Sequence, residues 1–301
     1  MQNYLSAAKE LLTIRDFIRW GMTQLNKAEA YFGHGTDNAW DEMVYLILHT
    51  LKLPHEVNKA ILDARLIEEE RFAIAEILWK RVSEKVPTPY LVHETWFAGI
   101  PFYVDQRVLI PRSPIAELIE KKFDPWIDVE KVNNILDLGT GSGCIAIAAA
   151  LAFPLAEVDA VDVSQDALAV AKINVDKHQV DDRVHLIESD VFNNLQSKVY
   201  DVIISNPPYV DQKDMQSLPK EYHHEPKLAL AAGQDGLEVV DRILKSAADH
   251  LNDYGILIVE VGNSAEALVE KYPNIPFIWL EFEHGHSEVF LLNKHDLDII
   301  R

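Results

Sequence analysis

Short apolar segments alternate with longer amphipathic ones from about residue 113 to the end of the chain. This alternation predicts strands joined by helices, as in a parallel sheet with helices on both faces. Segments 135–138 and 202–204 present apolar residues to both faces, as strands covered on both sides require. We therefore expect an α/β fold with a doubly wound, mostly parallel sheet.

Seven strands are predicted, at residues 133–139, 157–163, 184–189, 200–205, 255–262, 277–282 and 287–293. Helices are predicted between them at residues 144–153, 165–178, 237–251 and 264–272. The last two strands follow each other too closely for a helical crossover. They are expected to form an antiparallel hairpin at one edge of the sheet.

The N-terminal part of the chain has a different pattern, with apolar residues at helical spacing. Helical segments are predicted within 4–25, 37–53 and 68–84, the second with Asp37 or Asn38 as its N-cap. Alternating aromatic and apolar residues in 94–111 predict a β-hairpin. The predicted organisation is a small helical domain for substrate docking at 1–93, a linking hairpin at 94–112 and the sheet domain at 113–301.

Acidic residues outnumber basic ones, with 48 Asp and Glu against 28 Lys and Arg, for a net charge of −20. Such a surface repels nucleic acid and attracts basic partners, so we expect a basic protein substrate and no direct sequence-specific nucleic acid binding. The single cysteine, Cys144, allows no intrachain disulfide, which fits a reducing compartment. No signal peptide is recognisable, and the longest apolar run is too short for a membrane span. We expect a cytoplasmic protein with no membrane association.

A glycine-rich loop separates the first predicted strand of the sheet from the helix that follows. It reads Gly139, Thr140, Gly141, Ser142 and Gly143. Glycine permits a sharp turn and the close approach of a ligand, and the next helix offers free N–H groups. Both a dinucleotide and S-adenosylmethionine fit such a loop. The Gly-x-Gly-x-Gly spacing favours S-adenosylmethionine.

Carboxylates near the loop agree with this cofactor. Asp137 precedes the first glycine by two residues and is expected near the ammonium group of the methionine part. Asp162 ends the second predicted strand, where a carboxylate accepts both hydroxyls of a ribose. After the third strand, Asp190 is a candidate acceptor for the adenine amino group, and Val191 or Phe192 is a candidate to pack on the ring.

The fourth predicted strand of the sheet ends in Asn206, Pro207, Pro208 and Tyr209. A planar –NH2 nitrogen is a poor nucleophile because its lone pair is delocalised. The Asn206 side-chain carbonyl and the Pro207 backbone carbonyl would accept from its two hydrogens and orient it, and proline fixes the direction of that carbonyl. Tyr209 would offer a face to the flat group. Catalysis would then be mostly positioning, without metal or covalent intermediate.

Together, Asp137–Gly143, Asp162 and Asn206–Tyr209 resemble the amino-group methyltransferases with an Asn-Pro-Pro-Tyr signature. Residues 97–120 further resemble the glutamine-amide methyltransferases that modify translation proteins, and the resemblance spans nearly the whole chain. It implies a class I S-adenosylmethionine-dependent methyltransferase fold. It also makes Phe102 and Arg112 candidates near the cofactor or target.

The residues after the hairpin distinguish two branches of that family. The release-factor branch carries Pro-Arg-Pro-x-Thr-Glu, whereas this chain has Pro111-Arg112-Ser113-Pro114-Ile115-Ala116-Glu117. The latter pattern resembles the branch that methylates a glutamine of large-subunit ribosomal protein L-three, a basic substrate. A release-factor methyltransferase, a nucleic-acid amino-group methyltransferase and a non-catalytic assembly factor remain as alternatives.

Other clusters of reactive residues carry weaker signals. His284, His286 and Glu288 are better explained by a hairpin turn than by a zinc site, and no metal is expected. His223 and His224 are not required as a base, since the amide nitrogen loses its proton after attack.

Overall fold

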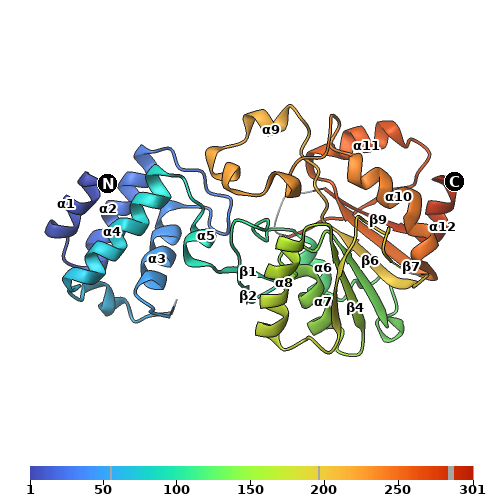
Figure 1. Cartoon of the computed structure of the whole chain (residues 1–301), viewed down its shortest axis with the longest axis horizontal. Coiled ribbons are helices and arrows are strands. Elements are labelled where there is room, and N and C mark those ends of the chain that lie inside the picture. Colours follow the sequence, from blue (N-terminus) through green and yellow to red (C-terminus); the bar gives the residue numbers. More distant parts are fainter. Residues whose placement is uncertain (55, 196, 284–287, 301) are drawn as a thin grey trace. The chain divides into compact units, whose positions relative to one another are not determined.

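The structure is a computed structural model that describes residues 1–54, 56–195, 197–283 and 288–300. The chain divides into two compact units, each with its own elements (Figure 1). The first comprises Met1–Glu94 and Pro219–His224, and the second comprises Thr95–Leu218 and Glu225–Arg301. The first unit thus includes a short segment from the C-terminal half of the chain. The three functional parts expected from the sequence stay a prediction.

The regular elements of the first unit are helices, joined by irregular segments, among the residues that the structure describes. Its helices are α1 (Gln2–Glu10), α2 (Ile14–Lys27), α3 (Ala39–Thr50), α4 (Glu68–Ser83) and α5 (Thr88–Val92), with 3-10 turns η1 (Lys59–Asp63) and η3 (Lys220–His224). They enclose a core that includes Phe17, Met43, Leu46 and Leu78.

Capping residues explain where these helices begin. The predicted helical segment 4–25 is split because Thr13 caps α2: its hydroxyl accepts from the backbone N–H of Asp16, and the Asp16 carboxylate accepts from the backbone N–H of Thr13. Asn38 caps α3, where its side-chain oxygen accepts from the N–H of Asp41, which confirms one of the two predicted caps.

A buried ion network lies within the first unit. The Arg81 side chain is 2% exposed and pairs with Glu42 and with Glu221, at 3.2 Å for the latter. Arg81 also donates to the backbone carbonyl of Tyr31 at 2.9 Å. A buried charge is tolerated only when it is paired, so Glu221 fixes the segment Pro219–His224 to this unit.

The second unit is built around a seven-stranded sheet. Its strands in chain order are β3 (Asn134–Leu138), β4 (Glu157–Asp162), β5 (Val184–Glu188), β6 (Tyr200–Ser205), β7 (Leu251–Glu260), β8 (Ile278–Trp279) and β9 (Val289–Asn293). The order across the sheet is β5-β4-β3-β6-β7-β9-β8. Pairs from β5 to β7 are parallel, and β9 is antiparallel to both its neighbours. The chain reverses direction across the sheet between β3 and β6, so this is where a ligand crevice is expected.

The helices of this unit are α6 (Ile115–Glu120), α7 (Cys144–Ala152), α8 (Gln165–His178), α9 (Asp214–Ser217), α10 (Glu238–His250), α11 (Ala265–Lys271) and α12 (Lys294–Leu297), with short 3-10 turns η2 (Val129–Lys131), η4 (Lys227–Ala229), η5 (Gly262–Ser264) and η6 (Asp298–Ile300). Helices cover both faces of the sheet, with α6 and α7 on one face and α10 on the other. The doubly wound, mostly parallel arrangement predicted from the sequence is confirmed.

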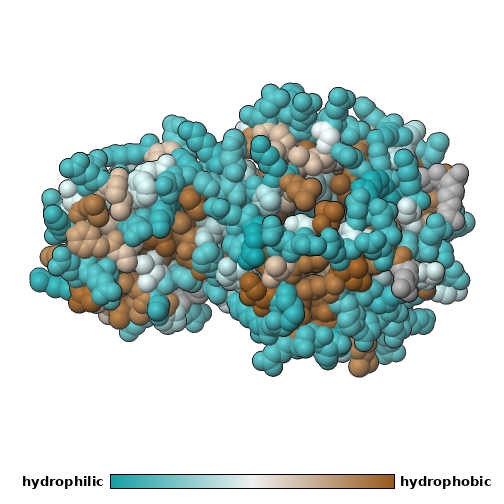
Figure 2. Space-filling model, in the orientation of Figure 1, coloured by the Kyte–Doolittle hydropathy of each residue, from teal (hydrophilic) through white to brown (hydrophobic). Residues whose placement is uncertain are grey.

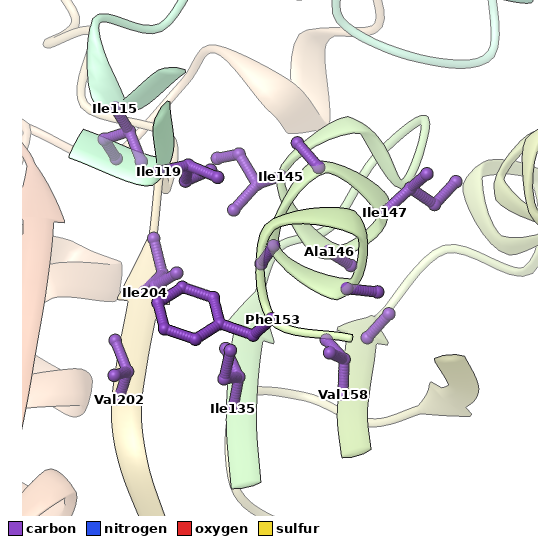
Figure 3. Packing of buried hydrophobic residues seen from close by; sticks show 14 of the residues in the cluster. Ile115, Ile119, Ile135, Ile145, Ala146, Ile147, Phe153, Val158, Val202 and Ile204 are labelled. Atoms are coloured by element: carbon purple, nitrogen blue, oxygen red, sulfur yellow. The ribbon is translucent and has the colours of Figure 1, made fainter. Parts of the chain in front are cut away.

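The strands divide their side chains between two cores. Val202 and Ile204 of β6 pack with α6 and α7 on one face, as Figure 3 shows around Phe153. Ile203, between them in the sequence, packs with α10 on the other face. Alternate residues of a strand point to opposite faces, so a strand covered on both sides must be apolar at successive positions.

The two predicted hairpins differ in how closely they match the structure. β1 (Thr95–Phe97) and β2 (Ile100–Phe102) pair antiparallel around Ala98 and Gly99, which confirms the hairpin. At the sheet edge, β8 and β9 also pair antiparallel, but β8 is shorter than the predicted 277–282. An edge strand has a neighbour on one side only, and β8 pairs with β9 at just two positions.

Hydrophilic residues cover much of the face shown in Figure 2, and hydrophobic ones gather in a few areas. Among the described residues, no helix combines the length and the apolar character needed to cross a membrane.

Candidate active site

A cavity of about 350 Å³ opens at the carboxyl ends of the parallel strands of the second unit. Residues at and after the ends of β3, β4, β5 and β6 form its walls, together with residues 107–109, the segment around η4 and the first two turns of α10. The predicted site residues that line the cavity are Gly139, Gly141, Asp162, Asp190, Val191, Asn206, Pro207 and Pro208. The cavity therefore unites predicted site residues that are up to 69 positions apart, at the edge where ligands bind in such folds.

The glycine loop leaves the sheet beside the Asn-Pro-Pro-Tyr loop. Leu138 and Ser205, the last residues of β3 and β6, are partners in the sheet, and the Ser205 hydroxyl donates to the Leu138 carbonyl at 2.8 Å. Gly139 and Gly141 adopt φ angles of +75° and +54°, which favour glycine. The two loops are thus fixed side by side by the sheet itself.

The other two predicted loop residues support the loop from outside the cavity. Thr140 is buried, and its hydroxyl donates to Asp137 at 2.6 Å. At Gly143, a side chain would approach the methyl group of Ala171 in α8 to 3.2 Å. This glycine permits close helix packing.

Asp137 lies beneath the loop and does not line the cavity. One of its carboxyl oxygens accepts from Thr140 and from the backbone N–H of Ala146 at 3.1 Å. The other has no hydrogen-bond partner. Burial raises the pKa of Asp137 to about 7, since the charged form is poorly solvated there. Its predicted position near an ammonium group stays a prediction.

Asp162 lines the cavity at the end of β4 and braces the glycine loop from the other side. One carboxyl oxygen accepts from the N–H of Gly141 and the other from the N–H of Ser164, both at 2.9 Å. Burial raises its pKa above the ordinary value, against the effect of these hydrogen bonds. Each oxygen has a second lone pair, so the carboxylate can still accept ligand hydroxyls.

Asp190 and Val191 follow β5 and also line the cavity. Asp190 forms an ion pair of 2.7 Å with Arg242 of α10, which lines the cavity too. Phe192, the alternative to Val191 in the sequence prediction, is instead buried and stacked on His250 at 4.5 Å. Val191 is therefore the residue of the two that faces the cavity.

The residues Asn206, Pro207 and Pro208 line the cavity at the end of β6, but Tyr209 does not. The Tyr209 hydroxyl donates to Glu260 at 3.0 Å, and its backbone carbonyl accepts from Ser264 at 2.8 Å. In this structure Tyr209 therefore anchors the loop that presents the other three residues.

The two candidates from the linking segment also lie outside the cavity wall. Phe102 is completely buried in the core beside Phe97 and His178. Arg112 forms a two-pronged ion pair with Glu225, at 2.7 and 2.9 Å. Their predicted contact with cofactor or target stays a prediction.

Sequence reasoning missed Glu260 and Arg242. Glu260 ends an apolar strand and is 2% exposed; an acidic residue directly after an apolar run was a sequence signal for its position, though not for its partners. Arg242 lies in an amphipathic helix, where a charged residue is ordinary.

The remaining reactive groups give no further site. Burial raises the pKa of Cys144 to about 12, as for an inert structural thiol. No group of three metal-binding side chains lies among the described residues, and His284 and His286 fall outside them.

Comparisons with known proteins identify relatives of this chain. The family model described as Methyltransferase small domain matches residues 125–225. A protein of Francisella tularensis named ribosomal protein uL3 glutamine methyltransferase is 49% identical over 95% of this chain and 92% of its own. A protein of the same name from Neisseria gonorrhoeae is 49% identical over 97% of both chains.

A crystal structure of the hMettl16 catalytic domain in complex with the MAT2A 3′UTR hairpin 6 has a similar fold. The TM-score is 0.52, over 79% of this chain and 87% of that one, at 17% identity. This likeness concerns the fold alone.

Proposed function

The chain belongs to the ribosomal protein uL3 glutamine methyltransferases, and we propose from this that it transfers a methyl group from S-adenosylmethionine to the side-chain amide nitrogen of a glutamine in uL3. The observation that carries the proposal is the shared cavity: Asn206 and Pro207 line the same space as Asp162 and the glycine loop. A methyl donor and an amide could therefore meet there.

We propose that the cofactor occupies the part of the cavity between the glycine loop, Asp162 and Asp190. The cavity volume of about 350 Å³ and the free lone pairs of Asp162 support this fit. Asp162 would hold the ribose hydroxyls, Asp190 the adenine amino group, and Val191 would pack on the ring. When bound, S-adenosylmethionine supplies an electrophilic methyl group on a sulfonium.

The glycine loop and Asp137 would hold the methionine part. Gly139 and Gly141 present their backbone to the cavity, whereas Thr140 and Gly143 keep the loop in shape from behind. The buried Asp137 oxygen without a partner supports a role for its charge at the cofactor's ammonium group.

The target amide would be oriented by the loop after β6. Its two N–H groups would donate to the Asn206 side-chain carbonyl and to the Pro207 backbone carbonyl. The nitrogen is thereby held with its lone pair toward the methyl donor, and most of the rate gain comes from this positioning. Pro207 and Pro208 keep the loop rigid, and Tyr209 anchors its end through Glu260. After transfer the nitrogen releases one proton to water.

The charge of the chain supports a basic protein as the partner, because a net charge of −20 favours such a substrate over nucleic acid. We retain a docking role for the helical N-terminal domain as part of the proposal. A ribosomal protein as substrate also implies a cytoplasmic location.

Transfer of a labelled methyl group tests the proposed function. The enzyme is incubated with labelled S-adenosylmethionine and, in parallel, with purified uL3, release factors and bare nucleic acid. We expect label on uL3 alone, mapped by mass spectrometry to a glutamine side chain. Label on release factors would assign the chain to the other branch, and label on nucleic acid alone would overturn the substrate class. An Asn206→Ala variant separates an enzyme from a chaperone, since only a chaperone would retain its activity.

A further inference from the structure

We propose that the neighbouring residues Arg112 and Ser113 position the target glutamine without touching it. Each holds one of two segments that wall the cavity: Ser113 holds the Asn-Pro-Pro-Tyr loop, and Arg112 holds residues 225–231. The inference rests on the proposed function and deepens it. All the contacts concerned lie within the second unit.

Ser113 reaches the Asn-Pro-Pro-Tyr loop through one buried carboxylate. Its hydroxyl donates to one oxygen of Glu260 at 2.5 Å, and the Tyr209 hydroxyl donates to the other at 3.0 Å. Ser113 is 6% exposed and Glu260 is 2% exposed. Hydrogen bonds to a buried charge are strong, so the position of each hydroxyl constrains the other through Glu260.

Two more contacts hold Tyr209 in the position from which its hydroxyl bonds Glu260. The Ser264 hydroxyl donates to the Tyr209 backbone carbonyl at 2.8 Å. Gly262, with φ +45°, lies against the Tyr209 ring, and a side chain there would come within 2.5 Å of it. The loop after Asn206 is thus held through the hydroxyl, the ring and the backbone carbonyl of Tyr209.

Arg112 holds the opposite wall. Its guanidinium bonds both oxygens of Glu225, whose side chain is fully buried. Glu225 begins the segment that contributes Pro226, Leu228, Ala229 and Ala231 to the cavity. Leu228 is 60% exposed at that wall, so the segment offers an apolar contact to an incoming peptide.

The two walls are joined to each other as well. Val210 follows Tyr209 directly, and its N–H donates to the Leu230 carbonyl at 2.9 Å. Its carbonyl accepts from the N–H of Ala232 at 3.0 Å. A closed circuit of contacts therefore runs from Ser113 through Glu260, Tyr209 and Val210 to residues 225–232, and back through Arg112.

The circuit predicts which property its residues control. Asp162 accepts its hydrogen bonds from Gly141 and Ser164, neither of which is a member of the circuit. Loosening the circuit should therefore weaken the use of the protein substrate and leave cofactor affinity unchanged. Because all members act on the same two walls, their effects should be less than additive.

Steady-state kinetics with uL3 and calorimetric binding of S-adenosylmethionine test the circuit. For Ser113→Ala and for Tyr209→Phe we expect kcat/KM toward uL3 to fall by about ten-fold each, the worth of one charge-assisted hydrogen bond. The cofactor Kd should stay within about two-fold, and the double variant should lose little more than either single one. Ser113→Thr keeps a hydroxyl and should restore most of the loss.

Tyr200→Phe is the matched control. Tyr200 begins the strand whose end carries Asn206, and its buried hydroxyl donates to Asp159 at 2.7 Å. The Tyr200→Phe substitution removes an equivalent hydrogen bond between a tyrosine and a carboxylate, far from the cavity wall. It should therefore lower the stability of the protein without changing kcat/KM toward uL3. The proposal is overturned if Ser113→Ala and Tyr209→Phe behave like Tyr200→Phe, or if their losses simply multiply in the double variant.

The same assays distinguish this proposal from the proposed function. If the wild-type protein does not methylate uL3, the proposed function fails. If it does, and the Ser113 variants retain wild-type kinetics, only the circuit fails. Arg112→Lys, which keeps the charge but loses the two-pronged geometry, should show the same pattern as Ser113→Ala.

Discussion

The glycine loop and the Asn-Pro-Pro-Tyr loop leave the same edge of the sheet from neighbouring strands, yet they are held in different ways. The glycine loop is braced by two carboxylates, Asp137 and Asp162, which accept hydrogen bonds from Thr140 and Gly141. These groups lie within 25 residues of one another in the chain. The second loop is anchored through Tyr209 to Glu260, Gly262 and Ser264, more than 50 residues away.

This difference separates the two tasks that we propose for the site. The cofactor would be bound by a locally specified structure, which one βαβ unit supplies. Target positioning would depend on contacts gathered from the whole second unit. Damage to the first loop should therefore appear as lost cofactor affinity, and damage to the second as a lost rate of transfer.

The largest effect is expected for Asn206→Ala. This change removes one of the two proposed acceptors of the target amide, and loss of a single positioned polar group of this kind costs on the order of 1,000-fold in rate. Cofactor affinity, measured by calorimetry, should stay within about two-fold. Asn194→Ala, at an exposed asparagine after β5, is the control. A rate for Asn206→Ala within about ten-fold of wild type would show that Asn206 does not orient the target amide.

Stability should depend on pH through Asp137. Its pKa is raised by burial to about 7 in the folded protein, against an ordinary 3.8. Between these values the unfolded chain loses the proton and the folded one keeps it, so the free energy of unfolding falls as pH rises. The free energy of unfolding falls by about 1.4 kcal/mol per pH unit, so the total loss reaches about 4 kcal/mol by pH 7 and then levels off.

Asp137→Asn should remove this part of the pH dependence, as measured by urea denaturation between pH 4 and 8 in the absence of cofactor. Asp166→Asn, at an exposed position in α8, controls for the loss of one carboxylate. If the free energy of unfolding varied with pH in the same way for Asp137→Asn and wild type, Asp137 would have an ordinary pKa in the folded protein.

Asp162→Asn should weaken cofactor binding on the order of 100-fold. The new –NH2 group meets the N–H of either Gly141 or Ser164 in place of an acceptor, and each lost bond to a charged group costs about 1.5–3 kcal/mol. Binding of S-adenosylmethionine by calorimetry measures the loss. An unchanged Kd would show that Asp162 and the glycine loop do not bind the cofactor.

The smallest expected effect concerns Gly262→Ala. The added methyl group overlaps the Tyr209 ring and forces the loop to shift. We expect kcat/KM toward uL3 to fall about ten-fold, with a normal cofactor Kd. Gly99→Ala is the control, because Gly99 has a similar positive φ but open space around it. Equal effects of the two changes would point to backbone strain alone.

Local patterns account for the part of the structure that sequence reasoning predicted. The alternation of strands and helices, the glycine loop and the strand-end position of Asn206 all depend on residues close together in the chain. The roles of Glu260, Gly262 and Arg242 could not be predicted, because each acts through a partner that only the folded sheet brings near. Tyr209 shows the limit: its place after β6 was predictable, but its orientation toward Glu260 was not.

Single-turnover methyl transfer to uL3 at saturating S-adenosylmethionine tests the division between the two loops most directly. Wild type, Asp162→Asn and Asn206→Ala are compared at cofactor concentrations well above each Kd. We predict that Asp162→Asn regains a rate within about ten-fold of wild type, because its defect is in binding, while Asn206→Ala stays on the order of 1,000-fold slower. Recovery of Asn206→Ala at saturating cofactor, or equal residual rates for the two variants, would contradict this account.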